Sequence, residues 1–423
     1  MNGKEKLKMA LSHQEASLLF DIGGTPTTGM HCIVVEKLRE YYGLEKRPVV
    51  IIEPMQMLGR LDQDLKEIMG IQTESLLTDK NMFGIKQTDQ FKEWKTPWGQ
   101  EVIIPTDFNT SKDDKGNTYL YACGDTNYLP AGCMPEGGFY FDATTRAPVF
   151  DEDNYDVQDN LEEFGSTSDE TLEWLRKERE RLENSPHAVI GNLGGTGLGD
   201  IALVPGVMLR EPKGIRDIEE WYISTVIRQD VLHEIFEYQT TCALENLRKM
   251  HAVLGETIQV AFVSGTDLGT QTAQFCSNET YRSLYMPYYK RVNDWIHENT
   301  TWKTFKHCCG SIFNLIPDFI ESGFDILNPV QWTATNMRKE DLKKHYGKDI
   351  TFWGGGVDTQ NLFPGGTPDQ VREQALLCCE ILAKGGGFVF NTIHNVLPDV
   401  PAENVAALAE AVKIFNGERR EIG

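Results

Sequence analysis

Long apolar runs are missing from this sequence, which excludes a chain that spans a membrane. No apolar run among the 423 residues approaches the about 20 residues that a transmembrane helix needs. The first residues also lack the apolar stretch and the small-residue cleavage site of a secretory signal. Both absences favour a cytoplasmic protein. Since 40% of the residues are hydrophobic, the chain still has ample material for a large core.

Basic residues are also scarce. The chain has 41 Lys and Arg against 63 Asp and Glu, which gives a formal net charge of −22. Nucleic acids and anionic membranes need basic surfaces, so we expect neither as a partner. The nine cysteines are an odd number and include the neighbours Cys308-Cys309 and Cys378-Cys379, a pattern unlike that of a disulfide scaffold. We therefore expect reduced thiols, some of them available as metal ligands.

The acidic residues are concentrated in one segment. Residues 101–170 hold 16 Asp and Glu against 3 Lys and Arg, a charge of −13, which leaves −9 for the other 353 residues. Turn signals such as Gly116-Asn117 and Gly137-Gly138 lie between short aromatic runs. These features predict hairpins and loops on the protein surface.

From residue 166 onward, short apolar runs alternate with helical patterns. The candidate strands, with two earlier ones added, are 18–22, 74–77, 187–190, 258–263, 304–307, 324–327, 350–353 and 388–390. Helices are predicted between them, at about 217–254, 277–298, 311–321, 338–346 and 367–384. Such alternation implies parallel strands, and eight strands predict an α/β fold of the (β/α)8 TIM-barrel type. A doubly wound sheet is the rival, but the spacing of Gly195, Gly197 and Gly199 does not fit its dinucleotide fingerprint.

The most distinctive pair of residues follows the fifth candidate strand. His307 and Cys309 are two positions apart on an extended chain, so their side chains point to one side while Cys308 points away. An imidazole and a thiolate at a strand end make half of a zinc site, and His394 after the last strand is a candidate third ligand. The alternative is a buried thiol beside a histidine that is bonded to a carbonyl.

Other polar and aromatic residues also follow the strands, where barrel enzymes keep their active sites. Asp358 comes after three glycines, which let the backbone approach a ligand closely. Glu373 lies early in a helix, where its default role is to stabilise the helix N-terminus. Asp21 either binds substrate or caps a turn, and Trp353 either lines a pocket or joins the core.

Several motifs together resemble the uroporphyrinogen decarboxylase superfamily over most of the chain. They are residues 307–312, 324–331, 354–360, 385–395 and 397–405. The resemblance implies one TIM-barrel domain over residues 1–423. The acidic region 85–165 is less typical, and we interpret it as a loop and hairpin insertion in the N-terminal part of that barrel.

The superfamily has two main chemistries, and the resemblance favours the second. Its decarboxylases carry an arginine-rich motif after the first strand, whereas this sequence has residues 21–29 there without an arginine. Its corrinoid-dependent methyltransferases bind zinc through a His-x-Cys pair and a later Cys, and His307, Cys309 and His394 occupy these positions. Ether-cleaving members have a Glu-x14-Glu-x20-His pattern. Asp358, Glu373 and His394 reproduce its spacing, with Asp in place of the first Glu, and form a second possible ligand set.

The resemblance therefore implies a zinc-assisted methyltransferase. It would move a methyl group from a small methylated substrate, such as a methoxylated aromatic, to the Co(I) cobalamin of a separate corrinoid protein. The cobalamin-ligating Asp-x-His-x-x-Gly motif is absent from the chain itself. The predicted catalytic residues are Asp267, Gln331 and Asp358. The predicted substrate-binding residues are Asp21, Gln271 and Trp353.

Two alternatives remain open. One is a decarboxylase or other lyase on the same barrel that acts on a small carboxylated substrate. The other is a non-catalytic barrel in which His307 and Cys309 are merely packed. A homodimer is compatible with each of these hypotheses.

Overall fold

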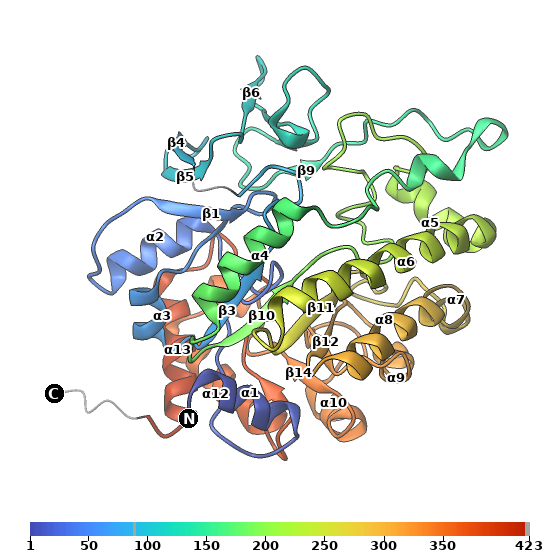
Figure 1. Cartoon of the computed structure of the whole chain (residues 1–423). Helices are drawn as coiled ribbons and strands as arrows, with labels where there is room; N and C mark the ends of the chain where they lie inside the picture. The colour runs from blue at the N-terminus through green and yellow to red at the C-terminus, as the bar shows by residue number, and fades with distance from the viewer. Residues whose placement is uncertain (88–89, 419–423) are drawn as a thin grey trace.

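A seven-stranded parallel sheet forms the centre of the molecule, with helices packed around it (Figure 1). The computed structural model describes residues 1–87 and 90–418. Neighbours in the sheet follow the order β15-β14-β13-β12-β11-β10-β3, and every neighbouring pair is parallel. The strands are β3 (Thr73–Leu77), β10 (Ala188–Asn192), β11 (Val260–Ser264), β12 (Lys303–His307), β13 (Ile326–Asn328), β14 (Thr351–Trp353) and β15 (Phe388–Val389).

The predicted first strand, residues 18–22, connects the two edges of this sheet. The Phe390 N–H donates to the Leu19 carbonyl, and the Asp21 N–H donates to the Phe390 carbonyl, each at 2.9 Å. On the other side, the Gln72 N–H, just before β3, donates to the Phe20 carbonyl at 3.1 Å. The segment forms an isolated parallel bridge rather than a regular strand. Because this segment is hydrogen-bonded toward both edges, the sheet curls in a TIM-barrel-like manner.

The helices that follow the strands largely match the predicted ranges. They are α4 (Asp169–Leu182), α6 (Gln229–Leu254), α8 (Met286–Asn299), α9 (Ile316–Glu321), α10 (Lys339–Tyr346), α12 (Pro368–Leu382) and α13 (Ala402–Phe415). The continuous helix predicted over 217–254 is wrong, because Arg228 has a non-helical backbone (φ −131°, ψ 44°) and separates α5 (Ile218–Ile227) from α6. No helix within the described ranges is long and apolar enough to cross a membrane.

The N-terminal helix α1 (Gly3–Leu11) lies across the start of the barrel strands, at the lower end of the molecule in Figure 1. Its Leu7 and Ala10 pack with inward-facing strand residues such as Ile190 and Phe305. Gly3 is pressed against the sheet: a Cβ there would lie 2.3 Å from the Gln72 carbonyl oxygen. Because α1 fills this end, the polar residues at the opposite strand ends are the ones that face open space.

Strands of the acidic region lie in two small sheets at the other end of the molecule, and one of these sheets also contains two strands that precede the region (Figure 1). One has the order β2-β1-β5-β4 and the other is the antiparallel meander β6-β7-β8-β9. These strands are β1 (Val49–Glu53), β2 (Leu58–Gly59), β4 (Phe91–Lys95), β5 (Glu101–Pro105), β6 (Thr110–Lys112), β7 (Thr118–Leu120), β8 (Gly132–Met134) and β9 (Asp142–Ala143).

The hairpins predicted for the acidic region are present, and they are anchored to the main core. Strand β5 pairs in parallel with β1, which precedes the region in sequence. Val102, Phe108 and Phe141 are buried in the same hydrophobic cluster as the barrel helices. That residues 85–165 are an insertion, and that 1–423 is one domain, stay predictions.

The packing of α1 predicts a large loss of stability for Leu7→Ala. Leu7 is fully buried, so the substitution leaves a cavity at the barrel base and should cost about 2–5 kcal/mol of unfolding free energy. Urea unfolding monitored by circular dichroism measures this cost. Lys8→Ala is the matched control, because Lys8 is exposed on the same helix and should change stability by less than about 0.5 kcal/mol. Equal stability of the two variants would contradict the packing role of Leu7.

Candidate metal centre

The three predicted zinc ligands come together at the strand ends. His307 is the last residue of β12, Cys309 follows two positions later, and His394 lies in the loop after β15. Their ligand atoms all lie within 4.8 Å of one another, and within the described residues no other group of three His, Cys, Asp or Glu is placed so closely. The Cys309 Sγ is 3.3 Å from the His307 Nε2, and the two imidazole rings are 5.3 Å apart between centroids.

The spacing of these donor atoms fits zinc. Zinc bonds of about 2.0–2.1 Å to nitrogen and about 2.3 Å to sulfur place two tetrahedral ligands roughly 3.5 Å apart. The observed 3.3 Å between sulfur and nitrogen is close to this value. Two imidazoles and one thiolate are also a donor set that zinc favours. The residues therefore fit the metal, and metal binding itself stays a prediction.

Asn328, at the end of β13, orients the imidazole of His307. Its Nδ2 donates to the Trp353 carbonyl at 2.9 Å, so its Oδ1 is the atom that faces His307 Nδ1 at 2.7 Å. An amide oxygen can only accept, so Nδ1 carries the proton and Nε2 is left with a lone pair directed toward Cys309. A hydrogen bond of this kind to the remote nitrogen is usual for metal-binding histidines.

Burial sets the protonation of the other two donors. It lowers the pKa of His394 to about 4, an effect to which the neighbouring His307 adds, so the imidazole is neutral at pH 7. Burial also raises the pKa of the Cys309 thiol well above its usual range, and the carboxylate of Asp267 raises it further. Cys309 is therefore a protonated thiol until a metal ion displaces the proton.

Asp267 and Gln331 hold the loop that carries Cys309. The Cys309 N–H donates to Asp267 Oδ1, and the Gly310 N–H donates to Gln331 Oε1, both at 2.6 Å. Gly310 has a φ of +91°, and a Cβ there would lie 2.5 Å from the carbonyl carbon of Gly269. Asp267 Oδ1 is also 3.9 Å from His307 Nε2. Two of the three predicted catalytic residues, Asp267 and Gln331, thus lie beside the candidate metal ligands.

The second predicted ligand set is not assembled. The Asp358 carboxylate accepts hydrogen bonds from the Gln360 and Asn361 N–H groups at 2.9 and 3.2 Å and so caps the turn that follows β14. Glu373 is exposed on α12. Gln271, a predicted substrate-binding residue, is also exposed.

Asp21 and Trp353, both predicted to bind substrate, are buried and bonded to each other. Asp21 Oδ2 accepts from the Trp353 indole N–H at 2.8 Å, and Oδ1 accepts from the Thr73 hydroxyl at 2.6 Å and from the Gly24 N–H at 2.9 Å. Neither side chain has exposed surface. Burial raises the pKa of the Asp21 carboxyl against the lowering effect of these bonds. A role in substrate binding stays a prediction for both.

Two residues near the candidate metal ligands have no role assigned from the sequence. One is Asn328, whose position at a strand end was the available signal. The other is Asp200, at the end of the glycine-rich loop after β10; its carboxylate lies against Gly265, where a Cβ would be 2.5 Å from Oδ2. Burial raises the pKa of Asp200, as does the charge of Asp267. Asp200 is far from Asp267 in sequence, so only the fold brings them together.

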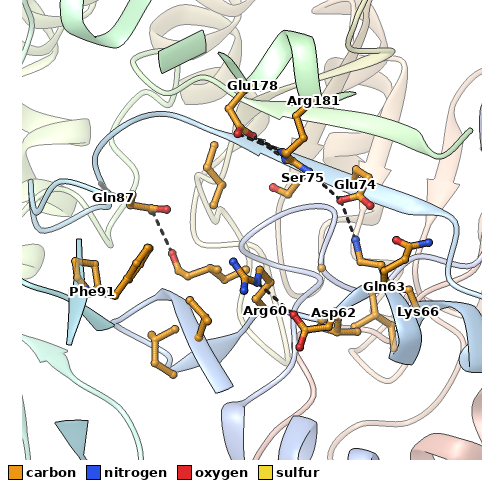
Figure 2. Close-up of a pocket in the computed structure, with 18 of the residues that line it drawn as sticks. Arg60, Asp62, Gln63, Lys66, Glu74, Ser75, Gln87, Phe91, Glu178 and Arg181 are labelled. Atoms are coloured by element: carbon orange, nitrogen blue, oxygen red, sulfur yellow. Dashed lines mark hydrogen bonds and ion pairs between the residues drawn. The ribbon is translucent and has the colours of Figure 1, made fainter. Parts of the chain in front are cut away.

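A cavity of about 470 Å³ lies between β1, β3 and α4. Figure 2 shows that its charged groups are already paired. The Lys66 ammonium group lies 3.0 Å from the Glu74 carboxylate, and the Arg60 guanidinium lies 3.4 Å from the Asp62 carboxylate. None of the predicted site residues lines this cavity.

Comparisons with known proteins give both a family and a fold. The family model described as uroporphyrinogen decarboxylase (URO-D) matches residues 141–415. A uroporphyrinogen decarboxylase from Chlorobium phaeobacteroides is 29% identical over 179 residues, which cover 40% of this chain and 47% of the relative. A methylated-thiol–coenzyme M methyltransferase from Methanosarcina mazei is 28% identical over 146 residues, which cover 34% of this chain and 35% of the relative.

A solved structure, a methyltransferase from Methanosarcina mazei, has a TM-score of 0.54 and covers 98% of this chain and 99% of its own. At 14% identity this likeness concerns the fold alone. The aligned segments span less than half the length of the two curated relatives named above.

The geometry predicts which cysteine holds a metal. Cys309→Ser should weaken zinc binding roughly a hundredfold or more, because a neutral hydroxyl replaces a thiolate ligand. Cys308→Ser is the matched control: Cys308 is turned into the core, where its Sγ accepts the Leu268 N–H at 3.2 Å, and a hydroxyl can accept the same bond. Zinc content of the purified variants, measured by elemental analysis, checks the prediction. Full zinc in both Cys309→Ser and His394→Ala would exclude this centre.

The protonation of the ligands predicts a pH dependence. Because Cys309 has a raised pKa, zinc must displace its proton, and the apparent zinc affinity should rise roughly tenfold per pH unit between about pH 7 and pH 9. His394, with a pKa of about 4, adds nothing to this slope because it is already neutral in that range. Competition titrations with a zinc-chelating dye at several pH values measure the slope. A flat profile would show that no thiol proton is displaced.

Proposed function

Because the chain belongs to the uroporphyrinogen decarboxylase family, we propose that it is a corrinoid-dependent methyltransferase of that family. Its reaction moves a methyl group from a small methylated substrate, such as a methoxylated aromatic, to the Co(I) cobalamin of a separate corrinoid protein. The observation that carries the proposal is the convergence of His307, Cys309 and His394 on one point at the strand ends. A decarboxylase that acts without a metal has no need of such a donor set.

When bound at these three donors, zinc supplies Lewis-acid chemistry, since it polarises the oxygen, sulfur or nitrogen atom that leaves the methyl group. With His307, Cys309 and His394 as its protein ligands, the ion would have a coordination position free for that atom. The amide oxygen of Asn328 accepts the His307 Nδ1–H and so holds the imidazole with Nε2 directed at the site. Asp267 and Gln331 fix the Cys309–Gly310 backbone, so the donor set is preorganised before a substrate arrives.

The corrinoid cofactor belongs to a partner in this proposal, because the chain lacks the Asp-x-His-x-x-Gly motif. The methyltransferase among the sequence relatives supports the reaction class. The methyl acceptor must reach the strand-end face of the barrel, since α1 fills the other end.

Decarboxylation is the second candidate, and the decarboxylases among the sequence relatives favour it. Against it stands the segment that follows the first barrel strand. Residues 21–29 contain no arginine, and the one carboxylate there, Asp21, is buried against Trp353. A substrate with several carboxylates would therefore meet no cationic clamp in this segment.

A direct assay separates the two candidates. The zinc-loaded protein, mixed with Co(I) cobalamin and a methoxylated aromatic donor, should methylate the cobalt, which changes the cobalamin absorbance spectrum. Uroporphyrinogen should remain unchanged under the same conditions. His394→Ala should lose at least about 99% of the methyl transfer, since it removes a metal ligand.

Cys308→Ser serves as the control that keeps the ligand set and should retain most of the activity. Release of carbon dioxide from a carboxylated substrate without any methyl transfer would overturn the proposal and favour the decarboxylase.

A further inference from the structure

A second, smaller cavity is lined by Asp200, whose carboxylate lies against the loop that leads to Asp267. It measures about 130 Å³ and is enclosed by the glycine-rich loop after β10, the start of α6 and the segment 203–208. Its apolar walls are formed by Phe164, Leu203, Val204, Met208, Trp221 and Ile235. A cavity of about 150 Å³ with apolar walls is known to accept one benzene molecule, so this space suits an apolar body of about that size.

Trp221, on α5, gives this cavity an unused hydrogen-bond donor. The side chain is 4% exposed, and its indole N–H has no hydrogen-bond partner within the described part of the chain. Glycine at position 199 keeps the space in front of this N–H open, since a Cβ there would lie 2.7 Å from Nε1. A buried indole N–H without a partner is costly, so a ligand that brings an acceptor to it gains affinity.

The one cation among the described lining residues is already paired. Arg216 is buried, and its guanidinium is held by both carboxylate oxygens of Glu163 at 2.7 and 2.9 Å. Arg216 also donates to the carbonyls of Lys213 and Asp159. The Asp200 carboxylate accepts the Ala202 N–H at 3.1 Å. Among the described lining residues no cation is left for a carboxylate ligand, which would lose its hydration without a counter-charge.

Asp200 links the cavity to the metal ligands. It lines the cavity, and its Oδ2 lies against Gly265, where a Cβ would be only 2.5 Å away. Two residues further along, Asp267 accepts the Cys309 N–H at 2.6 Å. The cavity wall is therefore connected to a candidate metal ligand through residues 265–267 and the hydrogen bond from the Cys309 N–H.

We propose that this cavity binds the body of the methyl donor, and that the donor is an uncharged molecule with one apolar ring or short branched chain and one hydrogen-bond acceptor. The inference rests on the proposed function for its identification of the ligand as methyl donor. The Trp221 N–H binds the acceptor, and the paired Arg216 and Glu163 exclude carboxylated molecules.

Three probes of similar size test the chemistry: anisole, toluene and benzoate. Their binding to the full-length, metal-free protein is measured by ligand-observed NMR titration, so the result depends on neither zinc nor cobalamin. Anisole should bind roughly threefold to tenfold more tightly than toluene, because only anisole has an acceptor for the indole N–H. Benzoate should bind at least about tenfold more weakly than anisole, since its charge is not matched.

Trp221→Phe tests the contribution of the indole hydrogen-bond donor alone. It keeps an aromatic wall but removes the N–H, so the preference for anisole over toluene should fall to about onefold. Trp295→Phe is the matched control on α8, because Trp295 lies against Arg248 and His251 rather than the cavity, and it should leave the preference intact. Val204→Phe, which fills the cavity, should abolish binding of both neutral probes.

An unchanged preference in Trp221→Phe, or benzoate binding as tight as anisole, would overturn the inference. If the neutral probes bind as expected while no methyl transfer occurs in the cobalamin assay, the cavity stands and the proposed function fails. If methyl transfer occurs but the probes do not bind, or bind equally to the Val204→Phe variant, the function stands and the cavity assignment is wrong.

Discussion

The hydrogen bonds of residues 18–22 to both edges of the sheet decide where the candidate ligands lie. Phe390 and Gln72, more than 300 positions apart in sequence, are bonded to the same short segment. Curvature of the sheet then turns the strand ends toward a common axis. His394, which follows β15, reaches His307 at the end of β12 only because the sheet is curved in this way. The candidate metal centre is therefore a consequence of tertiary structure, although each candidate ligand occupies an ordinary strand-end position.

Low solvent access gives the centre its chemistry. Burial lowers the pKa of His394 and raises the pKa of Cys309, so both side chains are uncharged when no cation is bound. The Asn328 amide fixes the tautomer of His307 without adding charge. A cation that binds here exchanges the thiol proton for the metal and gains a thiolate in surroundings of low polarity. The same burial would be costly for a permanent negative charge: Asn328 and Gln331 hold the ligands with uncharged amides, whereas Asp267, the acid that accepts the Cys309 N–H, keeps 27% of its side chain exposed.

The sequence was sufficient for features that depend on local pattern. Strand alternation placed His307 and Cys309 on one side and Cys308 on the other, and the structure agrees. Features that depend on partners far along the chain were not predictable. The end of α5 at Arg228 follows from tertiary packing, since the side chain reaches Glu152 in the acidic region at 3.3 Å. The approach of Asp200 to Gly265 likewise depends on how two loops from different strands meet.

The placement of cations separates the two chemistries that the family offers. Lys306, next to His307 on β12, is turned away from the barrel axis, and its ammonium group donates to the Ser264 hydroxyl at 2.9 Å and to the Thr266 carbonyl at 2.6 Å. The Arg216 guanidinium forms an ion pair with the Glu163 carboxylate. A bound zinc ion could accept one carboxylate, but a substrate with several would still leave the others unpaired in a chain of net charge −22. A neutral methyl donor avoids this cost, because it needs only a shaped apolar space and one polarised atom at the metal.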